Sequence, residues 1–138
     1  MAHPDFDELL NVLIPFAQQQ LQKHGGFFPF GATVTSAGEV VCNAGYEKES
    51  AEAEELIDLL TEAFRREAAA GNIRTAALCY DGRTLPLGKS KKTDAICIRM
   101  ENREDRSSTV FLPYRKGWFG RISYGELFAV ARERQFFL

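Results

Sequence analysis

Aromatic and basic side chains alternate in residues 114–121, the part of the sequence that offers the clearest candidate for a binding surface. Aromatic rings and arginine anchor many protein interfaces, and the same combination stacks on nucleic-acid bases. Two glycines would make this stretch a mobile loop, although a loop this aromatic could instead fold down over a sheet edge. We predict a surface for a protein partner, and the acidic pI of 5.7 disfavours nucleic acid. The candidate residues are Tyr114, Arg115, Lys116, Trp118, Phe119 and Arg121.

A second candidate is the segment 82–90, whose glycines, lysine and serine invite comparison with a phosphate-binding P-loop. That motif has four residues between its glycines, whereas Gly82 and Gly88 enclose five. A P-loop also opens a helix, but residues 95–100 alternate in polarity as a strand does. Spacing and context therefore argue against nucleotide hydrolysis and favour a plain β-hairpin loop.

The sequence shows no complete set of catalytic or metal-binding residues. Its two histidines are His3 and His24, and the second suits a helix C-terminus better than a catalytic dyad. The odd cysteine count, without C-x-x-C spacing, indicates reduced structural thiols rather than disulfides. Carboxylates crowd residues 52–62 without a histidine and are expected on a solvated helix face. We therefore expect no cofactor and lean against an enzyme; the cysteines are Cys42, Cys79 and Cys97.

Length and composition suit one globular domain, residues 1–138, with 45% hydrophobic residues. No apolar run approaches the roughly 20 residues of a transmembrane helix, and no basic region precedes the first apolar run. We expect a cytoplasmic protein that does not bind a membrane. Residues 1–82 hold 13 acids and 5 bases, net −8, whereas residues 83–138 hold 6 acids and 12 bases, net +6. Such a split could attract two copies into a homodimer, meet an acidic partner, or reflect ordinary solvated faces.

The N-terminal third predicts a helix, a sharp corner and a hairpin. Asp5 and Glu8 have capping-box spacing, and apolar residues recur at helical intervals as far as His24. The apolar stripe is wide enough to suggest cover on two sides, by the sheet and by a helix or second subunit. Pro15 predicts a kink, or alternatively a helix that starts there. Gly25 and Gly26 end the helix, and strands at residues 28–34 and 39–42 follow.

The corner carries three phenylalanines, and alternation along a strand would place Phe28 and Phe30 on one face and Phe27 on the other. This corner is expected to tie the helix to the sheet. An alternative is an apolar pocket for a small ligand, built near Phe28, Phe30 and Tyr46.

The rest of the chain predicts a helix capped by Ser50 and running to about Ala70, with strands at residues 73–80, 95–100 and 109–112. Pro113 indicates the end of a strand or a sheet edge. Ser123 and Glu126 repeat the capping-box spacing and predict a last helix that includes Leu127, Phe128 and Phe136.

The order α-β-β-α-β-β-β-α predicts an α+β fold, with one five-stranded, mainly antiparallel sheet and helices on its faces. This element order resembles that of roadblock and profilin-like domains, and the resemblance implies a homodimer that binds protein partners. Separately, residues 28–32, 93–96 and 111–114 resemble a family of small uncharacterised bacterial proteins. That family has no established activity, so the resemblance assigns no functional residue.

These observations favour a non-enzymatic interaction or regulatory module, expected as a homodimer. The alternative is a small-ligand-binding or catalytic domain with the apolar pocket described above. A toxin-neutralising immunity protein is a further alternative.

Overall fold

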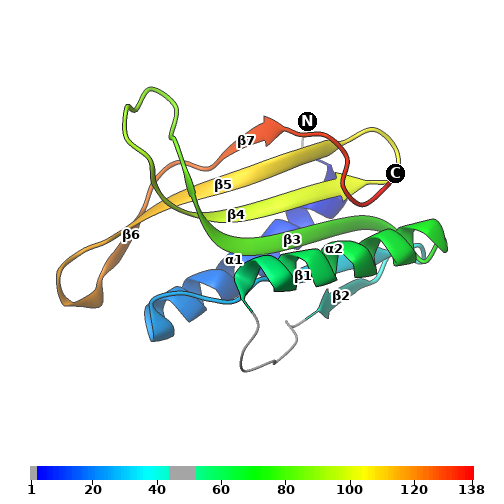
Figure 1. Cartoon of the computed structure of the whole chain (residues 1–138), viewed down its shortest axis with the longest axis horizontal. Helices are drawn as coiled ribbons and strands as arrows, with labels where there is room; N and C mark the ends of the chain where they lie inside the picture. Colours follow the sequence, from blue (N-terminus) through cyan, green and yellow to red (C-terminus); the bar gives the residue numbers. More distant parts are fainter. Residues whose placement is uncertain (1–2, 44–51) are drawn as a thin grey trace.

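The computed structural model describes residues 3–43 and 52–138, which form an α+β fold with a curled antiparallel sheet (Figure 1). Within these ranges the chain has two α-helices, seven strands and one short 3₁₀ turn. The elements are α1 (Pro4–His24), β1 (Phe30–Thr35), β2 (Val40–Asn43), α2 (Ala53–Ala69), β3 (Ile73–Thr84), β4 (Thr93–Asn102), β5 (Ser107–Lys116), η1 (Trp118–Gly120), β6 (Ile122–Tyr124) and β7 (Phe128–Ala131).

The strands form one sheet in the order β2-β1-β3-β4-β5-β6, and β7 pairs with β5. The outer side of β5 is shared: residues 108–111 pair with β7, and residues 114–116 pair with β6. Pro113 lies between the two pairings, where a residue without a backbone N–H is tolerated, and its carbonyl accepts the N–H of Gly125 at 2.8 Å. The sequence suggested that the strand ends at this proline or lies at a sheet edge. Instead β5 continues through Pro113 and changes its pairing partner there.

One helix covers each face of the sheet, as predicted, with α1 behind it and α2 in front in Figure 1. The core beneath α1 includes Leu9, Leu13 and Ala17 of the helix, packed with Ile96 and Ile98 of β4. The second cluster, beneath α2, includes Leu60, Phe64 and Leu78. The sheet is therefore the middle of three layers.

Helix α1 is continuous through Pro15 and ends at His24, and the next residue, Gly25, caps it with a φ of 72°. The alternative start at Pro15 is wrong. The capping-box prediction is also wrong: His3 Nδ1 caps the helix by accepting the N–H of Asp5, at 3.1 Å. The Asp5 carboxylate instead accepts two hydrogen bonds from Arg74 at 2.9 Å and one from Thr75 at 2.7 Å. This cluster ties α1 to β3.

Helix α2 begins after Glu52 and is followed by Gly71, with a φ of 75°. The predicted cap, Ser50, lies outside the described residues. The helix approaches β1 so closely that a Cβ on Gly31 would lie 2.6 Å from Cζ of Phe64 and 2.7 Å from the carbonyl oxygen of Ala77. Glycine at position 31 therefore lets the helix layer contact the sheet.

The predicted last helix is wrong, and so is the count of five strands. Residues 122–124 form β6 and residues 128–131 form β7, so two strands stand where the predicted order has its last helix. After β7 the chain crosses to the α2 layer, where Phe136 packs edge-to-face on Phe64 with ring centroids 5.2 Å apart. The buried carboxylate of Glu101 accepts the backbone N–H groups of Gln135, Phe136 and Phe137. Long-range contacts override the local helical pattern here.

The predicted arrangement of the three phenylalanines at the corner is also wrong. The strand begins only at Phe30, which is buried, whereas Phe28 precedes it and is 69% exposed. Phe27 packs on Phe30 with ring centroids 5.7 Å apart. The corner is therefore a bend that folds Phe27 against the core instead of a strand that separates it from Phe30.

Candidate functional site

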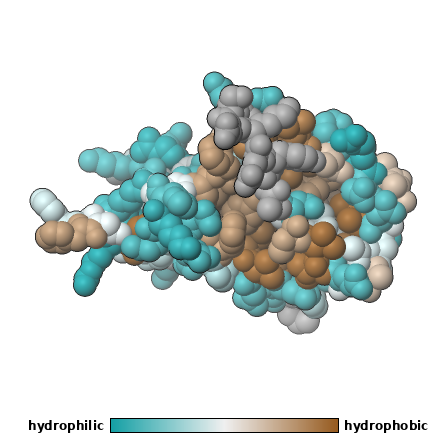
Figure 2. Space-filling view, turned by 90° about the horizontal axis from the view of Figure 1, so that it is seen from below, coloured by the Kyte–Doolittle hydropathy of each residue, from teal (hydrophilic) through white to brown (hydrophobic). Residues whose placement is uncertain are grey.

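The clearest candidate site is the hairpin formed by β5 and β6, which projects from one end of the molecule (Figures 1 and 2). Arg115 pairs with Ser123 and Lys116 with Ile122, and the Gly117 N–H donates to the carbonyl of Arg121 at 2.7 Å. We call residues 117–121 the hairpin tip. A tight turn of this kind leaves its central side chains without neighbours.

The hairpin tip exposes its two aromatic side chains almost completely. Trp118 is 87% exposed and Phe119 is 100% exposed. Phe119 also has a φ of 60° and a ψ of 31°, a left-handed conformation that is an outlier for a bulky residue. A strained backbone conformation costs free energy, and such conformations cluster at functional sites. The alternative interpretation, that this loop folds over the sheet edge, does not describe these two residues.

The hairpin contacts the end of α1 at two points, one at Lys116 beside the tip and one at Gly120 within the tip. The Lys116 ammonium donates to the carbonyl of Gly25, and the Gln22 side chain donates to the carbonyl of Gly120 at 3.4 Å. Lys116 is thus engaged within the protein, while Arg115 and Arg121 are exposed, and Arg121 lies next to the aromatic pair. The hairpin therefore presents Trp118 and Phe119 from a fixed position.

Tyr114 does not belong to this surface, although the sequence analysis placed it there. It lies on the α1 face of β5, is 4% exposed, and donates its hydroxyl proton to the Asp81 carboxylate at 2.6 Å. Burial raises the pKa of Tyr114, and the hydrogen bond to Asp81 and the charge of that carboxylate raise it further. Burial also raises the pKa of Asp81, although the hydrogen bond from Tyr114 opposes this. The pair supports the hairpin from inside.

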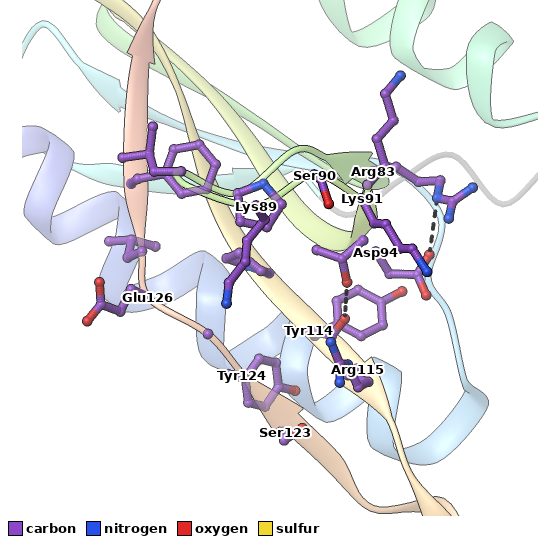
Figure 3. Close-up of a pocket in the computed structure, with 18 residues that line it drawn as sticks. Arg83, Lys89, Ser90, Lys91, Asp94, Tyr114, Arg115, Ser123, Tyr124 and Glu126 are labelled. Carbon is purple, nitrogen blue, oxygen red and sulfur yellow. Dashed lines mark hydrogen bonds and ion pairs between the residues drawn. The ribbon is translucent and has the colours of Figure 1, made fainter.

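A second feature is a cavity of about 840 Å³ between the β3–β4 loop (residues 85–92) and the strands β5 to β7 (Figure 3). The sequence did not indicate this cavity, because the spacing of Ser123 and Glu126 predicted a helix in place of β6 and β7. We call it the basic groove, since five bases and two acids line it. The bases are Arg83, Lys89, Lys91, Lys92 and Arg115, and the acids are Asp94 and Glu126.

The loop over this groove is the segment that was compared with a P-loop. It joins the antiparallel strands β3 and β4, so the interpretation as a hairpin loop is confirmed. Gly82 lies within β3, paired with Ala95, and is not part of the loop. No helix follows whose N-terminus could hold phosphate, because β4 begins at Thr93.

The three residues proposed for an apolar pocket are not seen together. Phe28 is exposed, Phe30 is part of the core under α1, and Tyr46 lies outside the described residues. Among the described residues, no group of three or more histidine, cysteine and acidic side chains could hold a metal ion. In the same ranges, neither helix is both long and apolar enough to cross a membrane.

The cysteines do not form disulfides: Cys42 is exposed, and Cys79 and Cys97 are buried in β3 and β4. Burial raises the pKa of Cys97 to about 12 and raises that of Cys79 as well. Protonated thiols of this kind are poor nucleophiles. The carboxylates of α2 that the sequence placed on a solvated face are exposed, as expected; they are Glu54, Glu55, Asp58 and Glu62.

Comparison of the chain with protein-family models, with curated proteins and with solved structures gave no match. We therefore infer function from the geometry of the hairpin tip and the basic groove.

Proposed function

We propose that this protein is a non-enzymatic interaction module that binds a protein partner through its hairpin tip. The observation that carries the proposal is the exposure of Trp118 and Phe119 on a hairpin that is held against α1. Burying a large apolar side chain is worth about 1.5–3 kcal/mol, and the isolated protein gains none of this for either residue. A partner with an apolar pocket would supply it.

The geometry of the hairpin favours binding by insertion. Because Lys116 and Gly120 are hydrogen-bonded to the end of α1, little backbone freedom is lost when a partner closes around the hairpin tip. Arg121 lies next to the aromatic pair and suits an acidic residue at the rim of a partner's pocket. Trp and Arg are also the residue types most enriched among interface hot spots.

The homodimer and the cytoplasmic location remain part of this proposal. A second subunit is supported by Val12 and Phe16 of α1, which are exposed although they extend the apolar stripe of that helix. Figure 2 shows hydrophobic residues gathered on the underside of the molecule. Free thiols at all three cysteines fit a reducing compartment.

The test is site-specific photo-crosslinking in the cells that make the protein. A photo-reactive phenylalanine analogue replaces Phe119 in one variant and Phe28, the matched exposed phenylalanine, in another. Partners linked from position 119 alone are purified, and their affinity is measured for the wild type and for the Trp118→Ser/Phe119→Asn double variant. Asparagine accepts the left-handed conformation, so this variant keeps the turn.

We expect one protein to crosslink from position 119 and the double variant to bind it at least about 30-fold more weakly, which corresponds to the loss of one hot spot. The Phe28→Ser control should bind as the wild type does. Crosslinks only to a second copy would make the hairpin tip the homodimer contact. Crosslinks only to lipid, or equal partners from both positions, would contradict the proposal.

A further inference from the structure

The charges around the basic groove are not balanced within the protein. Of its five bases, only Arg83 has an ion-pair partner among the described residues, and its distance to Asp94 is a long 3.9 Å. The groove therefore has three more bases than acids, in a chain with a net charge of −2. Gathering like charges is unfavourable, and Asp94 and Glu126 offset only two of the five bases, so a bound anion would relieve the remaining repulsion.

The bases lie on opposite walls of the groove. Figure 3 shows Lys89 and Lys91 extending from the β3–β4 loop, with Arg115 on β5 and Tyr124 on β6 across from them. Neither the lysine ammonium groups nor the Arg115 guanidinium has a hydrogen-bond partner among the described residues, so all remain available as donors. Ser90 and Ser123 add neutral hydroxyl donors to the same lining.

The groove also has an apolar wall. Tyr124, Leu87 and Leu127 line it and are all exposed, and Pro113 contributes to the same lining. Burial raises the pKa of Tyr124, so its hydroxyl stays protonated and can donate while the ring face is open to stacking. A ligand that fits both walls carries negative charge at one end and a flat apolar ring at the other.

We propose that the basic groove binds a small organic phosphate, with the phosphate held by Lys89, Lys91 and Arg115 and the ring lying against Tyr124. The volume of about 840 Å³ falls in the range of about 300–1,000 Å³ that is typical of small-molecule sites. The acidic balance of the whole chain opposes a long polyanion such as nucleic acid. This inference concerns binding alone and does not require residues 117–121, the hairpin tip, to bind a partner.

The test is isothermal titration calorimetry of the full chain at low salt with three probes: ATP, inorganic tripolyphosphate and adenosine. We expect ATP to bind more tightly than either, since only ATP offers both the charge and the ring. The Lys91→Ala/Arg115→Ala variant should bind ATP at least about tenfold more weakly, because two charge-assisted hydrogen bonds are lost. The control Lys23→Ala/Arg66→Ala removes the same charge from the ends of the two helices and should change the affinity less than about twofold.

Two further variants distinguish the contribution of the apolar wall to binding from that of the charged wall. Tyr124→Ala should weaken ATP binding and leave tripolyphosphate binding unchanged, whereas Glu126→Gln should strengthen both by removing a repelling charge. Circular dichroism confirms that each variant is folded. Absence of ATP binding at millimolar concentration, or equal loss in the control, would overturn the proposal. Equal affinity for tripolyphosphate and ATP would also overturn it, as would much tighter binding of a single-stranded oligonucleotide, which would make the groove a nucleic-acid surface.

Discussion

Replacing Glu101 with glutamine tests how the end of the chain is held on the sheet. Glu101 is 0% exposed, and its Oε2 accepts the N–H of Gln135 at 2.6 Å. Its Oε1 accepts those of Phe136 and Phe137 at 3.0 and 3.2 Å. Glutamine keeps the shape but replaces one oxygen with an amide NH₂, which must then face at least one of these donors.

The expected loss follows from these contacts. A buried donor without an acceptor costs about 1–3 kcal/mol, and the remaining bonds lose their charge assistance. A neutral amide is easier to bury than a carboxylate, which offsets part of the loss. The loss is also limited, because the segment can detach at the cost of exposing Phe136, about 1.5–3 kcal/mol. We therefore expect Glu101→Gln to lower the free energy of unfolding by about 1–3 kcal/mol.

Urea unfolding followed by far-ultraviolet circular dichroism measures this loss. Trp118 fluorescence is unsuitable, since that side chain is already exposed in the folded protein. With an m-value of about 1–3 kcal/mol/M, the midpoint should fall by about 1 M. Hydrogen exchange at the amides of Phe136 and Phe137 should accelerate in the variant. The matched control is Glu104→Gln, since Glu104 is exposed in the turn after β4.

A loss within about 0.5 kcal/mol, the usual range of surface substitutions, would refute this reasoning if amide exchange were also unchanged. The carboxylate would then have no part in holding the segment. A double-mutant cycle with Phe136→Ala gives an independent check. The two losses should not be additive, because either change alone can release the segment.

Two further predictions concern the contacts that join the helices to the sheet. Burial raises the pKa of Asp5, but the hydrogen bonds and charge of its partners outweigh burial and lower the pKa below the usual 3.8. The ionised Asp5 carboxylate therefore stabilises the folded protein above pH about 4, and this stabilisation is lost as the pH falls through the lower pKa of the folded state. Asp5→Asn should lower the free energy of unfolding at pH 7, and the difference from the wild type should disappear in acid. Urea unfolding at each pH measures this difference. Gly31→Ala should lower the free energy of unfolding by about 1–3 kcal/mol, because the added methyl group crowds Phe64. The control Gly125→Ala makes only ordinary contacts and should leave thermal unfolding unchanged. Equal losses in the two variants would contradict the close approach of α2.

The sequence predicted the elements whose signals are local and strong. Gly25, Gly38 and Gly71 all have positive φ where the helices or the first hairpin were expected to turn. The prediction of a last helix was wrong because the spacing of Leu127, Phe128 and Val130 fits a short helix as well as a strand. Pairing of β7 with β5 decides between them, and that contact is remote in sequence.

The candidate site was partly readable from residue types. The sequence singled out Trp118 and Phe119, but their exposure depends on a hairpin that requires β6, which had been read as helix. Tyr114 was misplaced although a signal existed: Val110, Leu112 and Tyr114 alternate on the face that packs under α1. The basic groove needed the loop 85–92 and the strand β6 together, and their separation in sequence hid it.

The fluorescence of Trp118, the only tryptophan in the chain, tests the central claim most directly. If the hairpin tip stands free as a binding anchor, its emission in dilute protein is that of a water-exposed indole, and acrylamide quenches it almost as well as free tryptophan. The emission should shift to the blue and become protected when the crosslinked partner is added. A blue-shifted, protected emission in the dilute protein alone would contradict the account.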